Sequence, residues 1–287
     1  MPAYTYVLES VAQAICAASG YTFGGGFNHG SFKETFLATK KDGEKLALKV
    51  LRPGCPTERS DREVDAMKRC AHPNIVALIE LAEFDHKGAK YTYLLEQFME
   101  GGSLDERLSS GLLDRKNVLA LGDELIRALV HIAEKDLVHR DFKPANILYA
   151  SPRGEALVCD FGIVRDLSKE SLTKTFLLAG PGTPFFAAPE QLNNDKSLID
   201  WRTDQFAVGV TLALAHLGYH PYQADSETPE QAILNVVSRK GPAERFVKAI
   251  AAVKLPALEK MVARWPVGRF RLPDELLVEW RKQSVEI

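Results

Sequence analysis

The sequence contains few cysteines, and they form no metal or disulfide pattern. The four cysteines (Cys16, Cys55, Cys70 and Cys159) are spread over 287 residues, and no two of them have CxxC spacing. Small secreted domains need a high density of cysteines for their disulfides, and the common zinc motifs need closely paired ones. We therefore expect a reducing, cytoplasmic setting for this chain.

The sequence also lacks an excess of either charge. Lysine plus arginine number 36 and aspartate plus glutamate number 38, so the formal net charge is -2. Proteins that bind nucleic acid normally carry a basic excess. We therefore expect no nucleic acid among the partners.

Long hydrophobic runs are missing as well. The longest apolar stretch, residues 206–217, contains Thr211 and His216 and falls short of the ~20 residues that span a bilayer. The first twenty residues include Glu9 and lack the basic start of a signal peptide. We expect no membrane segment. Apolar residues within residues 3–19 recur at helical spacing, which predicts an amphipathic helix available to a regulatory partner or for dimerisation.

The rest of the composition, 46% hydrophobic and 26% charged, is that of a folded protein. Strand-like alternation dominates the start of the chain, and helical spacing dominates its second half. Strands are predicted within residues 21–51, 75–81 and 91–98, and helices at residues 57–71, 116–134 and 203–217. This order predicts an α+β fold with a small β-rich lobe followed by a larger helical lobe.

The most informative part of the sequence is a pair of polar motifs, HRDFKPANIL and VCDFG, which follow one another in the middle of the chain. Phosphoryl transfer requires a carboxylate that orients the attacking hydroxyl, a cation near the phosphoryl group, and oxygen ligands for Mg²⁺. Asp141 and Lys143 provide the carboxylate and the cation. Asn146 and Asp160 provide the oxygen ligands.

At these motifs the chain resembles the catalytic domain of the eukaryotic-type (Hanks-type) serine/threonine protein kinases, which include bacterial members. The resemblance implies that Asp141 is the catalytic base and that Lys143 contacts the γ-phosphate. It implies that Asn146 and Asp160 hold Mg²⁺, for which Mn²⁺ can substitute. It also implies the bilobal kinase fold, with ATP as donor and a protein serine or threonine as acceptor.

The family's layout divides the chain into three parts. These are an N-terminal helical extension at residues 1–20, an N-lobe at residues 21–98 and a C-lobe at residues 99–287. The two lobes together form a single catalytic domain.

Upstream of the motifs, the segment LALK is similar to the kinase strand that carries the ATP-binding lysine. By this resemblance Lys49 binds phosphate and Ala47 lines the nucleotide. Glu63 stands where the family has the glutamate that pairs with this lysine. The alternative is local, because Ser60 and Glu63 also match the capping box that begins a helix.

The segment EQF resembles the kinase hinge, which binds adenine through its backbone. The resemblance assigns the adenine contacts to the Glu96 carbonyl and the Phe98 amide, with Leu95 in the gatekeeper position. Leu148, which follows the catalytic loop, is expected to contact the nucleotide as well.

The glycine-rich loop departs from the family pattern. Counting back from the strand lysine places it at NHGSFKET, rather than at the FGGGF cluster just before it. Only Gly30 remains of the three glycines, while Asn28 replaces the first and Thr35 replaces the valine. Asparagine tolerates a positive φ better than most residues. We expect Phe27, Asn28, Gly30 and Thr35 to contact ATP; the alternative is weakened ATP binding.

Downstream, the segment GTPFFAAPE resembles the end of the kinase activation segment. Thr183 would position the acceptor hydroxyl. The resemblance pairs Glu190 with Arg269 in a buried ion pair and makes Asp204 the anchor of the catalytic loop.

Within the activation segment, Thr173 and Thr175 resemble the TxT autophosphorylation sites of bacterial kinases. A phosphate there would add about -1.5 to -2 charges. The alternative is a solvated polar loop with no such role.

Two other functions stay open on the sequence. A nucleotide-binding pseudokinase that acts as a scaffold is motivated by the degenerate glycine-rich loop. A small-molecule kinase of the aminoglycoside phosphotransferase type would share the fold, but such enzymes generally lack a segment like GTPFFAAPE.

Overall fold

The computed structural model describes residues 7–29, 33–53, 70–160 and 183–285. The chain divides into two compact units. The first contains residues up to 71 together with residues 76–99, and the second contains residues 72–75 and nearly all residues from 100 onward. The division after residue 99 lies one residue beyond the predicted lobe boundary.

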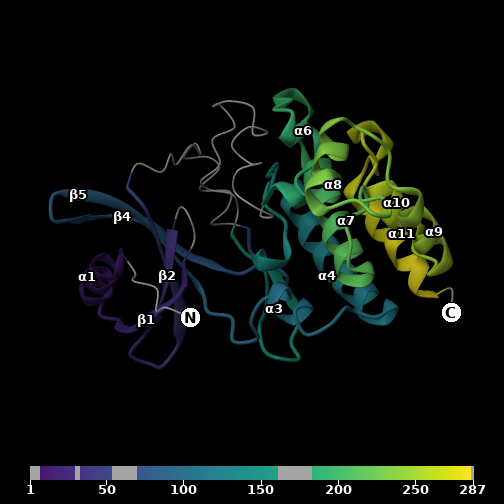
Figure 1. The fold of residues 1–287 in the computed structure, drawn as a ribbon. Coiled ribbons are helices and arrows are strands. Elements are labelled where there is room, and N and C mark those ends of the chain that lie inside the picture. The colour runs from purple at the N-terminus through teal and green to yellow at the C-terminus, as the bar shows by residue number, and fades with distance from the viewer. Residues whose placement is uncertain (1–6, 30–32, 54–69, 161–182, 286–287) are drawn as a thin grey trace. The chain divides into compact units, whose positions relative to one another are not determined.

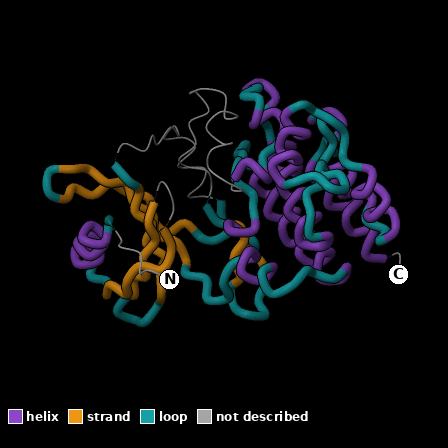
Figure 2. The backbone as a smooth tube through the Cα atoms, in the orientation of Figure 1, coloured by secondary structure: helices purple, strands orange, loops and turns teal. Residues whose placement is uncertain are grey.

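The first unit is built on one antiparallel sheet (Figure 2). Its elements are α1 (Glu9–Ser19), β1 (Thr22–His29), β2 (Lys33–Thr39), β3 (Lys45–Leu51), β4 (Leu78–His86) and β5 (Ala89–Gln97). The strands pair in the order β1-β2-β3-β5-β4. A tight turn joins β2 to β3: Gly43 has a φ of 90°, and its amide donates to the Lys40 carbonyl at 3.0 Å. The β-rich start is therefore confirmed.

The two faces of this sheet have different surroundings, because successive residues of a strand point to opposite sides. On one face Leu46, Leu48 and Val50 of β3 are fully buried. They share an apolar core with Leu95 of β5 and with α1. Lys49, which lies between Leu48 and Val50 in the sequence, points to the opposite face.

Helix α1 covers the first of these faces. Its buried side chains, Val11, Ala12, Ile15 and Cys16, belong to the core that includes β3. The predicted helix is therefore present, but its apolar face already packs on the sheet. A regulatory partner or a second copy would have to bind the polar face of α1, and such binding stays a prediction.

A buried carboxylate ties the start of α1 to the sheet. Glu34 of β2 is fully buried, and its two oxygens accept the Val7 amide at 3.1 Å and the Leu8 amide at 2.8 Å. Arg52 donates to the same carboxylate at 2.9 Å. The amides at a helix N-terminus have no partner within the helix and carry partial positive charge. Glu34 therefore compensates both these amides and the Arg52 guanidinium.

We expect Glu34→Ala to lower the free energy of unfolding by about 1.5–3 kcal/mol, the range for hydrogen bonds to a charged group. The reason is that Val7, Leu8 and Arg52 lose their common acceptor. Denaturant unfolding of the whole chain measures the change. Glu44→Ala is the control, because the exposed Glu44 side chain pairs only with Lys40 in the described structure. Equal stability of the two variants would contradict the role of Glu34.

The second unit is mostly helical and contains one short hairpin. Its elements are α3 (Leu104–Leu108), α4 (Arg115–Glu134), η1 (Pro144–Asn146), β6 (Ile147–Tyr149), β7 (Ala156–Val158), η2 (Thr183–Phe186), α6 (Pro189–Leu192), η3 (Lys196–Leu198), α7 (Trp201–Leu217), α8 (Pro229–Val237), α9 (Glu244–Ala252), α10 (Pro256–Met261), η4 (Pro266–Gly268) and α11 (Pro273–Val285). The predicted α+β class and the two long helices, α4 and α7, are confirmed. Within the described residues, no helix is both long and apolar enough to cross a membrane.

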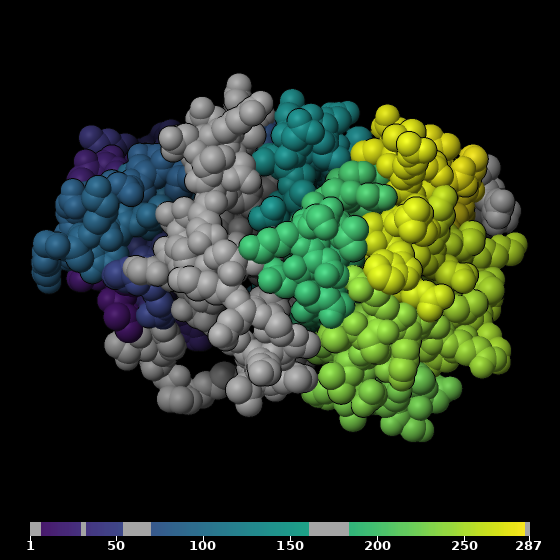
Figure 3. All heavy atoms as spheres, turned by 90° about the horizontal axis from the view of Figure 1, so that it is seen from above, coloured from purple at the N-terminus to yellow at the C-terminus, as the bar shows by residue number. Residues whose placement is uncertain are grey.

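Helix α4 packs against both α7 and α11, and Figure 1 shows these three helices together in the second unit. Trp280 of α11 is fully buried, and its Nε1 donates to the Leu119 carbonyl at 3.0 Å. A Cβ on Gly122 would lie 2.1 Å from the Trp280 ring, so only glycine permits this approach of α4 and α11. In the space-filling view the yellow C-terminal residues lie directly against the green residues of the same unit (Figure 3).

Candidate functional site

The predicted catalytic residues of the second unit converge on one carboxylate. Lys143 Nζ donates to Asp141 Oδ2 at 3.0 Å, and Asn146 Nδ2 donates to the same oxygen at 2.9 Å. Asn146 Nδ2 also donates to the Asp141 carbonyl at 2.8 Å. The Asp141 side chain keeps 17% of its surface exposed. Three residues that lie within six positions of the chain thus form a partly open polar cluster.

The loop that carries Asp141 is hydrogen-bonded to a buried carboxylate of α7. Asp204 is almost fully buried, and its carboxylate accepts the His139 amide at 2.6 Å and the Arg140 amide at 2.7 Å. Arg140 adopts a φ of 68°, an uncommon conformation for a residue with a side chain. Gln191 donates to the Arg140 carbonyl at 3.1 Å. The predicted anchoring role of Asp204 is confirmed, and Gln191 is a further support that the sequence analysis missed.

His139 joins this loop to the segment that follows β7. Its Nδ1 accepts the Asp141 amide at 3.2 Å, so the proton of the neutral ring lies on Nε2. That Nε2 donates to the Cys159 carbonyl at 2.9 Å. The Cys159 amide in turn donates to the Asn146 carbonyl at 2.9 Å. These bonds hold Asp160 next to the loop that carries Asn146.

The residues at this point fit a magnesium ion. Both hydrogen atoms of the Asn146 amide nitrogen are directed to Asp141, so the amide presents its Oδ1 to other ligands. Asp160 has a φ of 61°, a strained conformation of the kind that clusters at functional sites. An amide oxygen and a carboxylate suit Mg²⁺, which takes few protein ligands and completes its shell with water and phosphate. The described residues contain no cluster of three His, Cys, Asp or Glu side chains that could hold a metal ion.

In the first unit, the predicted nucleotide residues share one face of the sheet. The pairing places Thr35 opposite Lys49 and Lys49 opposite Leu94, and it places Ala47 opposite Glu96. Paired residues of antiparallel strands point to the same side. Lys49, Ala47 and Thr35 are therefore neighbours on the face that α1 does not cover, as the prediction requires.

The predicted gatekeeper is wrong by one residue. Leu95 lies opposite Leu48 and packs in the core against α1, on the other side of the sheet from Lys49. Glu96 occupies the place expected of Leu95, and its buried carboxylate accepts a hydrogen bond from Lys49 Nζ. The error has a physical cause, because the face that a strand residue occupies depends on register, and a shift of one residue exchanges the faces.

The amide of Phe98, which was predicted to bind adenine, forms a hydrogen bond within the sheet. The Phe98 amide donates to the Lys45 carbonyl at 3.4 Å, as a continuation of the pairing of β5 with β3. The Phe98 ring meets the half-exposed Phe27 ring edge to face, with centroids 5.4 Å apart. These two residues, each predicted to contact the nucleotide, therefore touch each other through their rings.

The loop that was predicted to cover the phosphates joins β1 to β2. Asn28 lies opposite Thr35, so the segment found by counting back from Lys49 includes the end of β1 and the start of β2. The glycine cluster before it lies within β1 at two register shifts. There Gly25 has a φ of 92°, and a Cβ on Gly24 would lie 2.8 Å from the Leu37 side chain. The irregular strand accounts for these glycines, which need no role in phosphate binding.

Of the other predicted residues, Leu148 and Thr183 belong to the second unit. Leu148 is half-buried between the buried Ile147 and Tyr149 of β6, so it points away from the side on which they lie. Thr183 begins η2. Four predicted residues lie outside the described part of the chain: Gly30, Glu63, Thr173 and Thr175.

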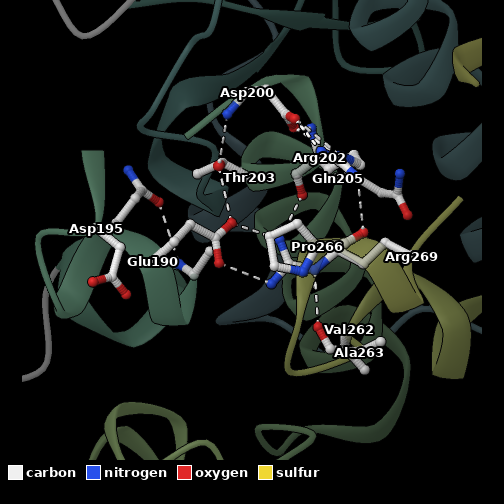
Figure 4. A network of polar contacts seen from close by, with 12 residues as sticks. Glu190, Asp195, Asp200, Arg202, Thr203, Gln205, Val262, Ala263, Pro266 and Arg269 are labelled. Atoms are coloured by element: carbon white, nitrogen blue, oxygen red, sulfur yellow. Dashed lines mark hydrogen bonds and ion pairs between the residues drawn. The ribbon is translucent and has the colours of Figure 1, made fainter. Parts of the chain in front are cut away.

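The predicted ion pair of the second unit is confirmed (Figure 4). Arg269 Nη1 donates to Glu190 Oε1 at 2.6 Å, and Nη2 donates to Oε2 at 3.0 Å. Both side chains are fully buried. Thr203 donates to the same carboxylate at 2.9 Å. The pair links the end of the GTPFFAAPE segment to α7 and to the loop before α11.

A buried histidine packs against the GTPFFAAPE segment. His220 is fully buried, its ring packs edge to face on Phe185 at 4.8 Å, and its Nδ1 accepts the Tyr222 amide at 3.0 Å. Burial lowers the pKa of His220 from its ordinary 6.5 to about 3. The ring is therefore neutral in the folded protein across the physiological range.

This histidine predicts a loss of stability in mild acid. The unfolded chain binds a proton at His220 below about pH 6.5, whereas the folded chain does not until about pH 3. The contribution of His220 is fully present above pH 6.5 and falls by about 1.4 kcal/mol for each pH unit below it. Denaturant unfolding between pH 7.5 and 5 measures this slope, which His220→Gln should reduce. His29→Gln, at an exposed site, is the control; equal slopes in both variants would refute the assignment.

Comparison with known proteins places this geometry in a family. The model of the protein kinase domain matches residues 21–260. A probable serine/threonine-protein kinase, PknB of Lactococcus lactis, is 30% identical over 201 residues. The match covers 68% of this chain but 30% of that protein, so the chain spans less than a third of its relative.

Solved structures show the same fold. A double mutant of the PknI kinase domain of Mycobacterium tuberculosis has a TM-score of 0.67 and 22% identity, with 93% of this chain and 96% of that chain covered. Rad53, solved as residues 1–466 in complex with AMP-PNP, has a TM-score of 0.69 and 19% identity, with 91% of this chain and 65% of that chain covered. Because the match to the family extends over residues 21–260 and includes both the Asp141 loop and the Lys49 strand, the chain belongs to the protein kinase family.

Proposed function

We propose that this chain is an active serine/threonine protein kinase that transfers the γ-phosphate of ATP to a protein hydroxyl. The observation that carries the proposal is the Asp141 carboxylate, whose Oδ2 accepts hydrogen bonds from both Lys143 and Asn146. These bonds fix the carboxylate in one orientation while part of its surface stays exposed. A general base must be held in this way to orient an incoming hydroxyl.

In the proposed reaction the oxygen of a serine or threonine hydroxyl forms a bond to the γ-phosphorus. The bond between that phosphorus and the oxygen bridging to the β-phosphate breaks, and ADP leaves. The hydroxyl proton passes to Asp141. Lys143, 3.0 Å from Asp141 Oδ2, provides positive charge beside the transferred group. Thr183 is proposed to position the acceptor.

Mg²⁺, or Mn²⁺ in its place, would be held by Asn146 and Asp160. When bound, the ion neutralises charge on the phosphates. Lys49, supported by Glu63, is proposed to bind the α- and β-phosphates. Rad53, which shares the fold, was solved with the ATP analogue AMP-PNP, and this supports ATP as the donor.

The residues that line the nucleotide are proposed as follows. Asn28, Gly30 and Thr35 belong to the phosphate loop, and Phe27, Ala47 and Leu148 contact the base. Glu96 takes the position expected of Leu95, and the Phe98 amide donates to the Lys45 carbonyl. We therefore propose adenine contacts one residue later in the chain than the sequence predicted. They fall on the Gln97 carbonyl and the Met99 amide.

The test incubates the protein with ATP labelled at the γ-position and Mg²⁺, in the presence of a general protein acceptor and an aminoglycoside. Label on serine or threonine is the expected result. Label only on the aminoglycoside would establish a small-molecule kinase. No transfer, despite binding of a fluorescent ATP analogue, would establish a scaffold, the alternative that the single glycine of the phosphate loop favours.

The same incubation tests autophosphorylation. The TxT pattern supports Thr173 or Thr175 as the acceptor. A phosphate there is proposed to pair with Arg140, as charge-assisted hydrogen bonds to guanidinium are strong. Mass-spectrometric mapping of the labelled protein is expected to find the phosphate on one of these threonines; an active enzyme without it would refute the assignment.

A further inference from the structure

A buried carboxylate lies beside the strand lysine on the face proposed to bind the nucleotide. Lys49 Nζ donates to Glu96 Oε2, and the two side chains keep only 6% and 8% of their surfaces exposed. Glu96 comes from the C-terminal end of β5, not from the segment around Glu63. It is therefore a second carboxylate for the lysine, beyond the one that the kinase pattern supplies.

The register explains how the two side chains meet. Lys49 lies opposite Leu94, and Glu96 lies opposite Ala47, so the charged residues are diagonal neighbours on one face of the sheet. Long side chains reach across such a diagonal. Ala47 is the small residue between them along this face, and it leaves room for the lysine side chain to lean toward Glu96.

The other acidic side chains that the register places on this face lie on β4, one strand further from Lys49. They are Glu83 and Asp85, and both are exposed. Glu83 pairs with Lys90 at 2.9 Å, and the side chains of this pair are about 60% exposed. Among the described residues of the sheet, Glu96 is thus the buried carboxylate that compensates the Lys49 ammonium.

Because both side chains are buried, removing the charge of either one has a high free-energy cost. A carboxylate beside a buried ammonium favours its protonated form, and removal of one member of a buried pair is strongly unfavourable. A neutral or displaced amine at position 49 would bind phosphate poorly. The charge on Glu96 therefore affects whether Lys49 is protonated and where its ammonium lies before ATP arrives.

We propose that Glu96 is a positioning residue for ATP binding, which holds the Lys49 ammonium on the nucleotide face of the sheet. The proposal rests on the proposed function, since it assigns Glu96 a role in the same site. Glu96 acts through Lys49 and does not itself touch the reacting atoms. In this respect the end of β5 contributes a side chain, and not only peptide groups, to nucleotide binding.

Two variants separate the charge of Glu96 from its shape. Glu96→Gln keeps the size and the hydrogen-bonding oxygen but removes the charge, and Glu96→Asp keeps the charge on a shorter side chain. Glu83→Gln is the matched control, because it removes one charge from the exposed Glu83–Lys90 pair of the same sheet. Melting temperatures show whether each variant folds.

The first measurement uses no nucleotide. A small acylating reagent labels Lys49 in the free protein at pH 7.5, and mass spectrometry follows the rate. Labelling is expected to be at least fivefold faster in Glu96→Gln, because loss of the Glu96 charge increases the fraction of Lys49 that is a neutral amine, and only the neutral amine reacts. Glu96→Asp should restore the slow rate. A rate in Glu96→Gln equal to that in Glu83→Gln would overturn the proposal.

The second measurement is the affinity for a fluorescent ATP analogue, followed by KM for ATP and kcat. We expect Glu96→Gln to bind the analogue at least tenfold more weakly, with KM raised more than kcat is lowered and with partial rescue in Glu96→Asp. Unchanged or tighter binding would overturn the positioning role, since Glu96 would then have no effect on phosphate binding or would oppose it. If the wild-type protein bound no analogue, the proposed function would fail, whereas the labelling rates would still decide whether Glu96 controls Lys49.

Discussion

Replacement of Asp141 by asparagine is expected to lower kcat by about 10²–10⁴-fold, the usual contribution of a general base. The asparagine side chain has the same size and keeps an oxygen for Lys143 and Asn146, which now donate to Asp141 Oδ2 at 3.0 and 2.9 Å. It does not accept the proton of the attacking hydroxyl. Initial rates of transfer from labelled ATP measure the effect, which should appear in kcat rather than in the affinity for ATP.

The control for this variant is Asp225→Asn, which makes the same chemical change at a side chain that is 83% exposed. Its rate should equal that of the wild type. The melting temperature of Asp141→Asn should also be close to wild type, because Asp204 and His139 hold the loop independently. Wild-type turnover in Asp141→Asn would refute the assigned base. A large fall in melting temperature would show that the lower rate results from unfolding rather than from loss of the base.

Arg269→Ala is expected to produce the largest loss of stability, about 3–5 kcal/mol, as is typical when one member of a buried ion pair is removed. Glu190 would be left fully buried and, among the described residues, would keep the Thr203 hydroxyl as its side-chain hydrogen-bond donor. Arg269 also donates to the Ala263 and Arg202 carbonyls, both at 2.8 Å, and these acceptors would lose their partner. The midpoint of denaturant unfolding measures the change.

Arg269→Lys should recover little of this stability. A lysine has one point charge and cannot reproduce the two parallel bonds of the guanidinium to Glu190, at 2.6 and 3.0 Å. Lys248→Ala, which breaks an exposed pair with Glu244 in the same unit, should leave the midpoint unchanged. If Arg269→Ala were no less stable than Lys248→Ala, the pair at Glu190 would have no structural role.

The sequence allowed correct predictions where the chemistry is local or the pattern is long. The Asp141 cluster lies within six residues, so its spacing alone restricts its geometry. The pairing of Glu190 with Arg269 spans 79 residues, and it was predicted only through the resemblance to kinases. Helix α4 was predicted from its helical spacing, whereas α7 was predicted from a long apolar stretch, and its residues from Thr203 to Ala213 are all buried.

The features that the sequence misassigned or did not reveal depend on how distant segments of the chain pair. Leu95 and Glu96 are adjacent in the sequence, and only the register of β5 against β3 decides which of them shares a face with Lys49. Glu34 resembles any charged residue of a strand until α1 covers it and Arg52 approaches it. The FGGGF cluster lies at register shifts in β1, which no local pattern reveals.

The packing of the two end helices has a practical consequence for any shortened form of the protein. The match to the family covers residues 21–260, yet α1 lies before it and α11 lies after it. A fragment cut at these limits would expose the apolar side of the sheet under α1 and the surface of α4 that Trp280 covers. Such a fragment is expected to aggregate on expression, although it would retain every proposed catalytic residue.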